Sequence, residues 1–261
     1  MTGRQSGFPL PVNRFKAALQ AGERQVGLWC SLANAYAAEV VAGAGYDWLL
    51  LDTEHSHADV ADVLAQLQAV AAYPCAPVVR PPSNDPVIIK RLLDAGAQTL
   101  LIPQVDSPEQ ARQAVAATRY PPAGVRGVSA LTRATRFGRV PGYATTAHTE
   151  LCVVVQVESV HALECLEQIA KVDGVDGVFV GPGDLAASLG HPGELKAPAV
   201  VAAVEDAIRR IRALGRPAGV LTTDRDFARR CEELGTTFTA VGIDIALLAR
   251  AADALAKEFR Q

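Results

Sequence analysis

The stretch Trp48-Leu49-Leu50-Leu51-Asp52-Thr53-Glu54-His55-Ser56-His57 decides how we interpret the fold. Its first half is an apolar run that follows Gly45 and is too short for a helix, so it predicts a buried strand. Acids and histidines stand where this strand must stop, and a carboxylate there is costly to desolvate unless it is paired. In parallel α/β sheets, functional sites lie at that end of the strands. The stretch therefore indicates a functional site, and the alternative is a solvated turn whose acids cap the next helix.

The same succession of strand and helix recurs along the whole chain. Predicted strands cover residues 26–30, 48–52, 77–80, 99–102, 152–157, 177–180, 217–221 and 238–241. Helical patterns follow them at about 34–44, 58–72, 85–96, 108–119, 160–171, 199–214, 224–234 and 244–257, and a short helix over 12–19 precedes them. Repeated strand–helix units favour a (β/α)₈ TIM barrel over an open doubly wound sheet. Such a barrel takes roughly 250 residues, so residues 1–261 are predicted to be a single domain.

Bulk properties exclude several classes of function. The net charge is −3, so no global field recruits nucleic acid. The first six residues carry no apolar signal-peptide core, and no run of about 18 apolar residues predicts a membrane span. The five cysteines are odd in number, scattered and never spaced as C-x-x-C, which indicates reduced core residues of a cytoplasmic protein.

Three further strand ends carry polar residues. Arg80 closes the third predicted strand, where a guanidinium can bind a carboxylate or a developing oxyanion. Gln156 and Glu158 end the fifth strand and share one face because side chains alternate with period 2. The sixth strand runs into Gly181-Pro182-Gly183-Asp184, whose glycines let the backbone approach a ligand.

Glu158 and Asp184 follow neighbouring strands, and two carboxylates in that position can share one cation. Oxygen ligands with room for water favour Mg²⁺ or Mn²⁺ over structural zinc. The alternative is that both carboxylates only cap helices. No lysine falls at the end of a predicted strand, which argues against a Schiff-base mechanism; the lysines are Lys16, Lys90, Lys171, Lys196 and Lys257.

One long connection, residues 120–150, interrupts the strand–helix rhythm and is rich in proline, glycine and arginine. Long irregular segments inside compact domains are usually functional or form interfaces. Its arginines, counted from the end of the preceding helix, are Arg119, Arg126, Arg133, Arg136 and Arg139, and no acid follows until Glu150. Residues 119–139 are therefore either a flap that guides anionic substrates into the site or a surface for contact between subunits.

Six motifs in order resemble the HpcH/HpaI family of metal-dependent class II pyruvate aldolases. They are Trp48-Leu49-Leu50-Leu51-Asp52-Thr53-Glu54-His55, Pro77-Val78-Val79-Arg80-Pro81, Leu92-Leu93-Asp94-Ala95-Gly96-Ala97-Gln98-Thr99-Leu100, Tyr120-Pro121-Pro122-Ala123-Gly124-Val125-Arg126-Gly127-Val128, Gln156-Val157-Glu158 and Gly181-Pro182-Gly183-Asp184-Leu185. The resemblance covers about residues 15–259. One departure is Gly183, where similar family members often carry alanine.

The resemblance implies a role for each matching residue. Glu158 and Asp184 would hold a divalent metal ion (Mg²⁺, Mn²⁺ or Co²⁺), while Gln156 and the backbone at Gly183 and Asp184 would bind pyruvate or hydroxypyruvate. Arg80 would bind substrate and stabilise the oxyanion. His55 would be the acid/base, with Asp94 raising its basicity and Asp52 supporting it. Family members form hexamers that exchange their last helix, so a homohexamer with residues 243–259 packed on a neighbour is expected.

The expected activity is reversible cleavage of a 4-hydroxy-2-oxo acid into pyruvate and an aldehyde such as succinic semialdehyde. Two related activities are alternatives: a lyase for a CoA thioester such as citramalyl-CoA, and an aldolase for 2-keto-3-deoxy acids derived from sugar acids. A non-catalytic barrel that binds a ligand or assembles with others is the alternative from another class. The expected partners are small molecules and further copies of the chain, with neither nucleic acid nor membrane.

Overall fold

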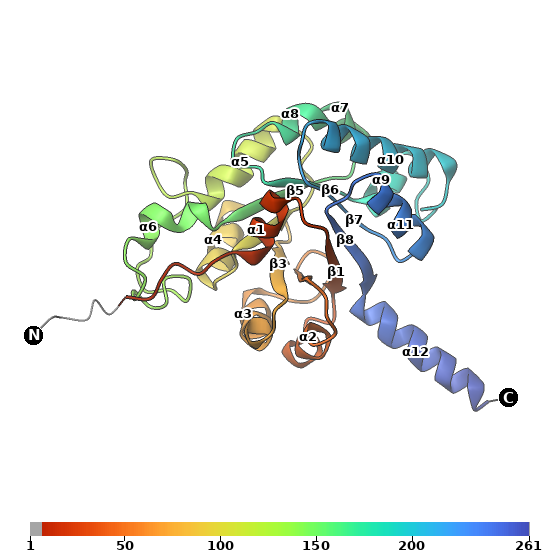
Figure 1. The fold of residues 1–261 in the computed structure, drawn as a ribbon, viewed down its shortest axis with the longest axis horizontal. Coiled ribbons are helices and arrows are strands. Elements are labelled where there is room, and N and C mark those ends of the chain that lie inside the picture. The colour runs from red at the N-terminus through yellow and green to blue at the C-terminus, as the bar shows by residue number, and fades with distance from the viewer. Residues whose placement is uncertain (1–6, 261) are drawn as a thin grey trace, which may run out of the picture.

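The computed structural model describes residues 7–260 and contains a closed barrel of parallel strands joined in chain order (Figure 1). The strands are β1 (Gln25–Cys30), β2 (Trp48–Asp52), β3 (Ala76–Arg80), β4 (Thr99–Ile102), β5 (Cys152–Val157), β6 (Gly177–Val180), β7 (Ala218–Leu221) and β8 (Phe238–Ile243). Parallel pairing of β8 with β1 closes the barrel. The predicted (β/α)₈ architecture is therefore confirmed, and each predicted strand lies within two residues of an observed one.

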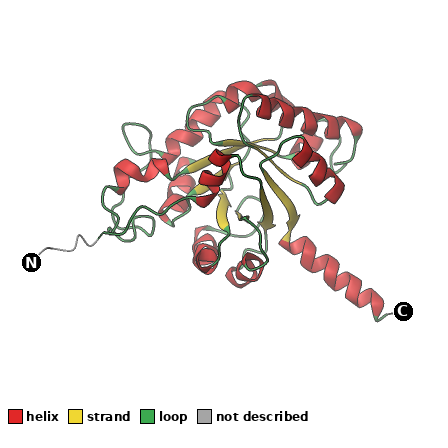
Figure 2. Cartoon of the chain, viewed as in Figure 1, coloured by secondary structure: helices red, strands yellow, loops and turns green. Residues whose placement is uncertain are grey.

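Helices surround the strands (Figure 2). They are α1 (Arg14–Ala21), α2 (Ala35–Ala42), α3 (Val60–Ala69), α4 (Pro86–Asp94), α5 (Pro108–Thr118), α6 (Tyr143–Thr146), α7 (Val160–Glu164), α8 (Leu166–Ala170), α9 (Pro182–Ser188), α10 (Pro198–Ala213), α11 (Arg225–Glu233) and α12 (Asp244–Glu258), with short 3₁₀ turns at Val70–Ala72 and Ala147–Thr149. The helix predicted over 160–171 is divided at Cys165, whose backbone leaves the helical region. Helix α9 was not predicted from the sequence. None of the described helices is long and apolar enough to cross a membrane.

Alternate residues of the strands separate the core into two layers. Trp48 and Leu50 point into the barrel with Val78, Val154 and other apolar side chains. Leu49 and Leu51 belong to the larger layer between strands and helices. Because this alternation has period 2, the next inward position on β2 is Asp52. The same rule brings Arg80 on β3 and Gln156 on β5 to the inner mouth of the barrel.

Helix α1 closes the opposite, N-terminal end of the barrel. Asn13 caps this helix by accepting from the backbone of Lys16, and its side chain donates to Thr99 Oγ1 at the start of β4 (2.9 Å). Phe15 packs edge-on against Trp48 and Phe238 at ring-centroid distances of 5.6 Å each. Since this end is filled by aromatic side chains, the polar mouth at the C-terminal ends of the strands is the end open to substrates.

Two segments extend beyond the compact barrel. Residues 120–142 form an irregular excursion between α5 and α6. Helix α12 points away from the barrel (Figure 1), and only its first residue, Asp244, is buried. Large apolar side chains on the helix and at its C-cap are exposed, among them Leu248 (60%) and Phe259 (81%).

Candidate active site

An ion-pair network forms where β2 and β3 end side by side. Asp52 and Arg80 are register partners on these strands. The Arg80 side chain donates from Nε to Asp52 Oδ1 (2.9 Å) and from Nη2 to Oδ2 (2.7 Å). Its remaining terminal nitrogen, Nη1, lies 2.8 Å from Glu54 Oε2. All three side chains are nearly inaccessible to solvent, which makes the pairing necessary because an unpaired buried charge is strongly unfavourable.

The two acids of this network respond differently to burial. Burial by itself would raise the pKa of Asp52, but the hydrogen bonds and charge of Arg80 hold that pKa below its usual range. The backbone N–H of Glu54 and the indole of Trp29 (3.1 Å) also donate to the Asp52 carboxylate. Burial raises the pKa of Glu54, and the Arg80 and His55 charges offset this only in part. Asp52 is therefore a fixed anion that orients Arg80, while Glu54 binds a proton more readily.

His55 lies at the rim of the network and is accessible to solvent. Its side chain is 63% exposed, and Nε2 lies 3.9 Å from Glu54 Oε2. Asp52 was expected to support His55, and the contact that the structure shows is a long backbone hydrogen bond, from the His55 N–H to Asp52 Oδ1 (3.4 Å). The carboxylate beside the imidazole is Glu54, so Asp52 acts on the His55 main chain and not on its ring.

A second group of polar residues follows β5 and β6. Glu158 is buried, accepts from the backbone N–H of Gln104 (2.8 Å) and contacts the side-chain amide of Gln156. Burial raises the pKa of Glu158 to about 7, and the negative charges of Asp184 and Glu54 add to this effect. Asp184 stands in the first turn of α9, which begins with Pro182 at a position favourable for helix initiation.

Gly181 leaves space for the side chains of Glu158 and Gln156. A Cβ at this position would meet Glu158 Oε2 at 2.6 Å and Gln156 Nε2 at 2.9 Å, so only glycine fits without moving them. At Gly183 a Cβ would meet no atom within 4 Å, which agrees with the alanine expected there in similar proteins.

The two groups line one cavity of about 460 Å³ at the mouth of the barrel. Its polar lining is Ser31, Asp52, His55, Arg80, Gln156, Glu158 and Asp184, its apolar lining is Trp29, Phe179, Pro182, Leu221, Ile243 and Ile245, and Gly181 and Gly183 complete it. The structure therefore brings together every predicted catalytic, substrate-binding and metal-ligating residue except Asp94.

The cavity fits a divalent cation. Burial and neighbouring carboxylates make the charged form of Glu158 unfavourable, and a cation would reverse that effect. The side-chain oxygen of Gln156 is buried without a hydrogen-bond partner among residues 7–260, so an acceptor remains available. No cluster of three or more His, Cys, Asp and Glu side chains suited to a metal occurs in the described part of the chain. A metal at Glu158 and Asp184 would therefore take further ligands from substrate and water.

Asp94 lies at the other end of the barrel. It is the last residue of α4, which runs back from the C-terminal end of β3 toward the start of β4. There it accepts from Arg126 Nη2 at 2.8 Å, and the Arg126 guanidinium, fully buried, also lies over the ring of Tyr120. The structure does not bring Asp94 to His55 of the same chain, so a contact between them would have to form between two copies, and its effect on the basicity of this histidine stays a prediction.

The arginine-rich segment is also separated from this cavity. None of its five arginines lines the mouth of the barrel. Arg126 is buried against Asp94, while Arg133, Arg136 and Arg139 line a different cavity beside the residues that precede β4. The expectation of an anion-guiding flap over the site is therefore wrong for the single chain.

Sequence reasoning left three contributing residues without a role. Glu54 is the next alternate position after Trp48, Leu50 and Asp52, so the period-2 pattern could have identified it. Trp29 holds Asp52 through its indole, and Gln104 holds Glu158 through its backbone N–H. Gln104 adopts a positive φ of 53°, for which no local sequence pattern is a signal.

Comparison with known proteins identifies the family of this chain. The model of the HpcH/HpaI aldolase/citrate lyase family matches residues 25–251. A pyruvate aldolase from Rhizobium etli is 66% identical over 96% of this chain and 98% of its own length. A 4-hydroxy-2-oxo-heptane-1,7-dioate aldolase from Salmonella arizonae is 57% identical over 95% of this chain and 94% of its own. The crystal structure of an HpcH/HpaI aldolase/citrate lyase family protein from Burkholderia cenocepacia J2315 is similar at a TM-score of 0.92 and 42% identity, covering 96% of this chain and 100% of that one. The chain thus belongs to the HpcH/HpaI aldolase/citrate lyase family and is a carbon–carbon lyase.

Proposed function

We propose that this lyase is a class II pyruvate aldolase that reversibly cleaves a 4-hydroxy-2-oxo acid into pyruvate and an aldehyde. The observation that carries the proposal is the shared cavity, in which the pair Glu158 and Asp184 faces the ion-paired Arg80 and the exposed His55. The names of the two relatives support pyruvate as the ketone product and a dicarboxylic 4-hydroxy-2-oxo acid as one substrate.

The two carboxylates in the cavity support a divalent metal ion as part of this proposal. Glu158 and Asp184 would hold Mg²⁺, Mn²⁺ or Co²⁺, because these hard cations prefer oxygen ligands. When bound, the ion would act as a Lewis acid that stabilises negative charge on the 2-oxo group. The Gln156 amide and the backbone of the α9 first turn would orient the carboxylate end of the substrate.

Arg80 is positioned to stabilise a developing oxyanion. Two of its five N–H groups donate to Asp52, and Nη1 lies 2.8 Å from Glu54 Oε2, so further N–H groups remain as donors for the substrate. Because Asp52 and Glu54 fix the guanidinium before substrate arrives, little reorganisation is needed in the transition state.

His55 is the proposed acid/base. In the cleavage direction it would accept the proton of the 4-hydroxyl as the C3–C4 bond breaks. The bonding electrons then form the enolate of pyruvate, and protonation at C3 completes the reaction. Glu54, 3.9 Å from Nε2, stabilises the imidazolium formed in the first step.

The exposed apolar face of α12 supports a further part of the proposal. Helix α12 contacts its own barrel only near its start, and the exposed Leu248 on the helix and Phe259 at its C-cap would be covered in an assembly of several copies. We propose a homohexamer in which this helix packs on a neighbouring copy.

The test is an assay of the purified chain after treatment with EDTA. Release of pyruvate from 4-hydroxy-2-oxoheptanedioate and exchange of the pyruvate methyl protons in D₂O should both be lost. Addition of Mn²⁺, Mg²⁺ or Co²⁺ should restore both. A metal-free enzyme with full activity would refute the metal site, and restored exchange without cleavage of any 4-hydroxy-2-oxo acid would refute the substrate class.

A further inference from the structure

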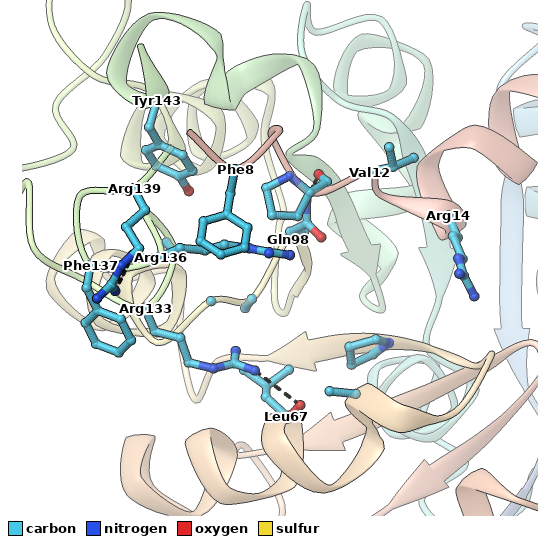
Figure 3. A pocket seen from close by; sticks show the side chains of 16 residues that line it. Phe8, Val12, Arg14, Leu67, Gln98, Arg133, Arg136, Phe137, Arg139 and Tyr143 are labelled. Carbon is cyan, nitrogen blue, oxygen red and sulfur yellow. Dashed lines mark hydrogen bonds between the residues drawn. The ribbon is translucent and has the colours of Figure 1, made fainter. Parts of the chain in front are cut away.

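One wall of the active-site cavity is formed where β1 and β8 end. Ser31, Ile243 and Ile245 line this wall. In the closed barrel β1 lies across from β5, the strand that leads to the proposed metal ligand Glu158, so the wall faces the metal side of the cavity. It belongs to the C-terminal ends of the strands, whereas the arginine-lined cavity of Figure 3 borders the beginning of β3 and the turn before β4.

The wall contacts the part of the substrate that leaves as the aldehyde, if the proposed function holds. His55, the proposed acid/base, follows β2, and β2 pairs with β1. Because the 4-hydroxyl of the substrate meets His55 in that mechanism, the carbon chain beyond C4 extends toward the ends of β1 and β8. There Ile243 and Ile245 offer it apolar surface. The shape of this wall therefore affects how well an aldehyde is bound.

The carboxylate of Asp244 joins the two parts of the wall. Asp244 stands between the two isoleucines and is buried, with 5% of its surface exposed. Its Oδ1 accepts from the backbone N–H of Ser31 (2.9 Å) and its Oδ2 from that of Leu32 (3.2 Å). Successive backbone N–H groups can form a concave site for an anion. Oδ1 also accepts from the N–H of Ile245 (2.6 Å), so the same carboxylate contacts the loop after β1 and the first turn of α12.

The loop after β1 requires a partner that holds it. It connects β1 to α2 and contains Ala33 at a φ of 52°. This left-handed conformation is unfavourable for a residue with a Cβ, and it persists where the surrounding structure maintains it. At the end of the loop, Asn34 caps α2 by accepting from N–H groups of the first turn. The loop is therefore fixed at one end by this cap and at the other by Asp244.

We propose that Asp244 is a positioning residue for the aldehyde end of the substrate. It does not line the cavity itself, and it acts by holding the loop after β1 against the start of α12. An aspartate suits this position because each of its two oxygens can accept from one of the two loop N–H groups. A buried carboxylate is costly unless it is hydrogen-bonded, so the loop and the carboxylate stabilise each other.

The test is the variant Asp244→Asn, which keeps the size of the side chain and leaves one acceptor oxygen for two loop N–H groups. In condensation with pyruvate and Mn²⁺, the KM for succinic semialdehyde should rise at least ~10-fold, as for loss of a hydrogen bond to a charged group. The KM for pyruvate and the exchange of pyruvate methyl protons in D₂O should stay within about twofold, because the metal side is unchanged. A role in folding alone would lower kcat through the active fraction and would not separate the two KM values.

The matched control is Asp226→Asn, which makes the same substitution at an exposed acid on α11 and should leave both KM values as in the parent. A second pair of variants addresses the loop. Glycine adopts the backbone conformation of residue 33 without strain, so Ala33→Gly/Asp244→Asn should have a KM for succinic semialdehyde between those of the parent and Asp244→Asn. If Asp244→Asn does not fold, the double variant is compared with Ala33→Gly and should show the higher KM.

Three results would overturn the proposal. The first is a KM for succinic semialdehyde that is the same in Asp244→Asn and the parent. The second is an equal rise of both KM values, which would place the effect on the metal side. The third is a smaller species in sedimentation velocity, which would assign Asp244 to the assembly through α12. A parent that exchanges pyruvate protons but condenses no aldehyde would instead refute the proposed function, so the two failures are distinguishable.

Discussion

Arg80 donates to both carboxylate oxygens of Asp52, at 2.9 and 2.7 Å, although the two residues belong to different strands. The pair is buried, and Arg80 also forms an ion pair with Glu54, the residue that follows β2 toward the mouth of the barrel. The stability of the fold and the proposed substrate binding therefore involve the same guanidinium.

The first prediction concerns this pair. Asp52→Ala leaves the buried Arg80 with one of its two carboxylates, so the free energy of unfolding should fall by about 3 kcal/mol. Urea unfolding measures it. The control Asp226→Ala removes an exposed carboxylate 3.6 Å from Arg229 and should change stability by less than about 0.5 kcal/mol. Equal losses in the two variants would show that the Asp52–Arg80 pair does not stabilise the fold.

The second prediction is a pH dependence of stability in the metal-free protein. The pKa of Glu158 is raised from its ordinary value of 4.5 to about 7, so between these values the folded state binds more protons than the unfolded state. Stability from this group is present below pH 4.5 and is lost as pH rises through 7, by up to about 3 kcal/mol.

Urea unfolding in EDTA at several pH values between 4.5 and 8 measures this slope. Glu158→Gln should remove it, and Glu164→Gln, an exposed acid, should keep it. A slope that is the same in all three proteins would refute the raised pKa. In the parent protein, Mn²⁺ should bind more tightly as pH rises, because the ligand must lose its proton.

The third prediction is that borohydride with pyruvate will not inactivate the enzyme. Among the described residues that line the active-site cavity there is no lysine. Lys16 lies near the other end of the barrel, where Nζ donates to the carbonyl oxygen of Leu151 at 2.7 Å. Intact-mass spectrometry after reduction should show the unmodified chain. A pyruvyl adduct on a lysine would refute the class II mechanism.

The sequence was sufficient to predict the barrel because its signals are local. Short apolar runs and period-2 alternation identified every strand, and alternation also predicted that Gln156 and Glu158 share a face. Arg80 and Asp52 could each be placed at a strand end, but not their pairing, because strand register is a tertiary property. Helix α9 was missed because Gly181-Pro182-Gly183 resembles a loop, although proline is favourable in a first turn.

Other features depend on how distant segments meet. Asp94 was assigned to His55 from a family resemblance, whereas the direction of α4 carries it to the opposite end of the barrel. Arg133, Arg136 and Arg139 lie in a segment without regular secondary structure, so the position of Arg133 beside Gly96 could not be deduced. Only the folded chain shows that they line a cavity separate from the catalytic one.

The fourth prediction separates two histidines of the same loop. His55→Ala should lower kcat for cleavage by roughly 10²–10⁴, because a positioned acid/base is lost. His57→Ala is the matched control, since His57 is exposed and does not line the active-site cavity in the described structure, and it should retain kcat. Metal affinity should be the same in both variants. Equal kcat values would exclude His55 as the acid/base.

The last prediction compares two glycines of one turn. In Gly181→Ala the new methyl group would lie 2.6 Å from Glu158 Oε2, so the carboxylate must leave its present position. Because a metal shared by two carboxylates needs both in place, Mn²⁺ affinity should fall by at least ~10-fold, as for loss of a metal-supporting contact. In Gly183→Ala the methyl group meets no atom within 4 Å, so Mn²⁺ affinity should be preserved. Calorimetric titration of Mn²⁺ into both variants measures the difference. If Gly181→Ala binds Mn²⁺ as tightly as Gly183→Ala, Glu158 is not a ligand, and the metal must be held elsewhere in the cavity.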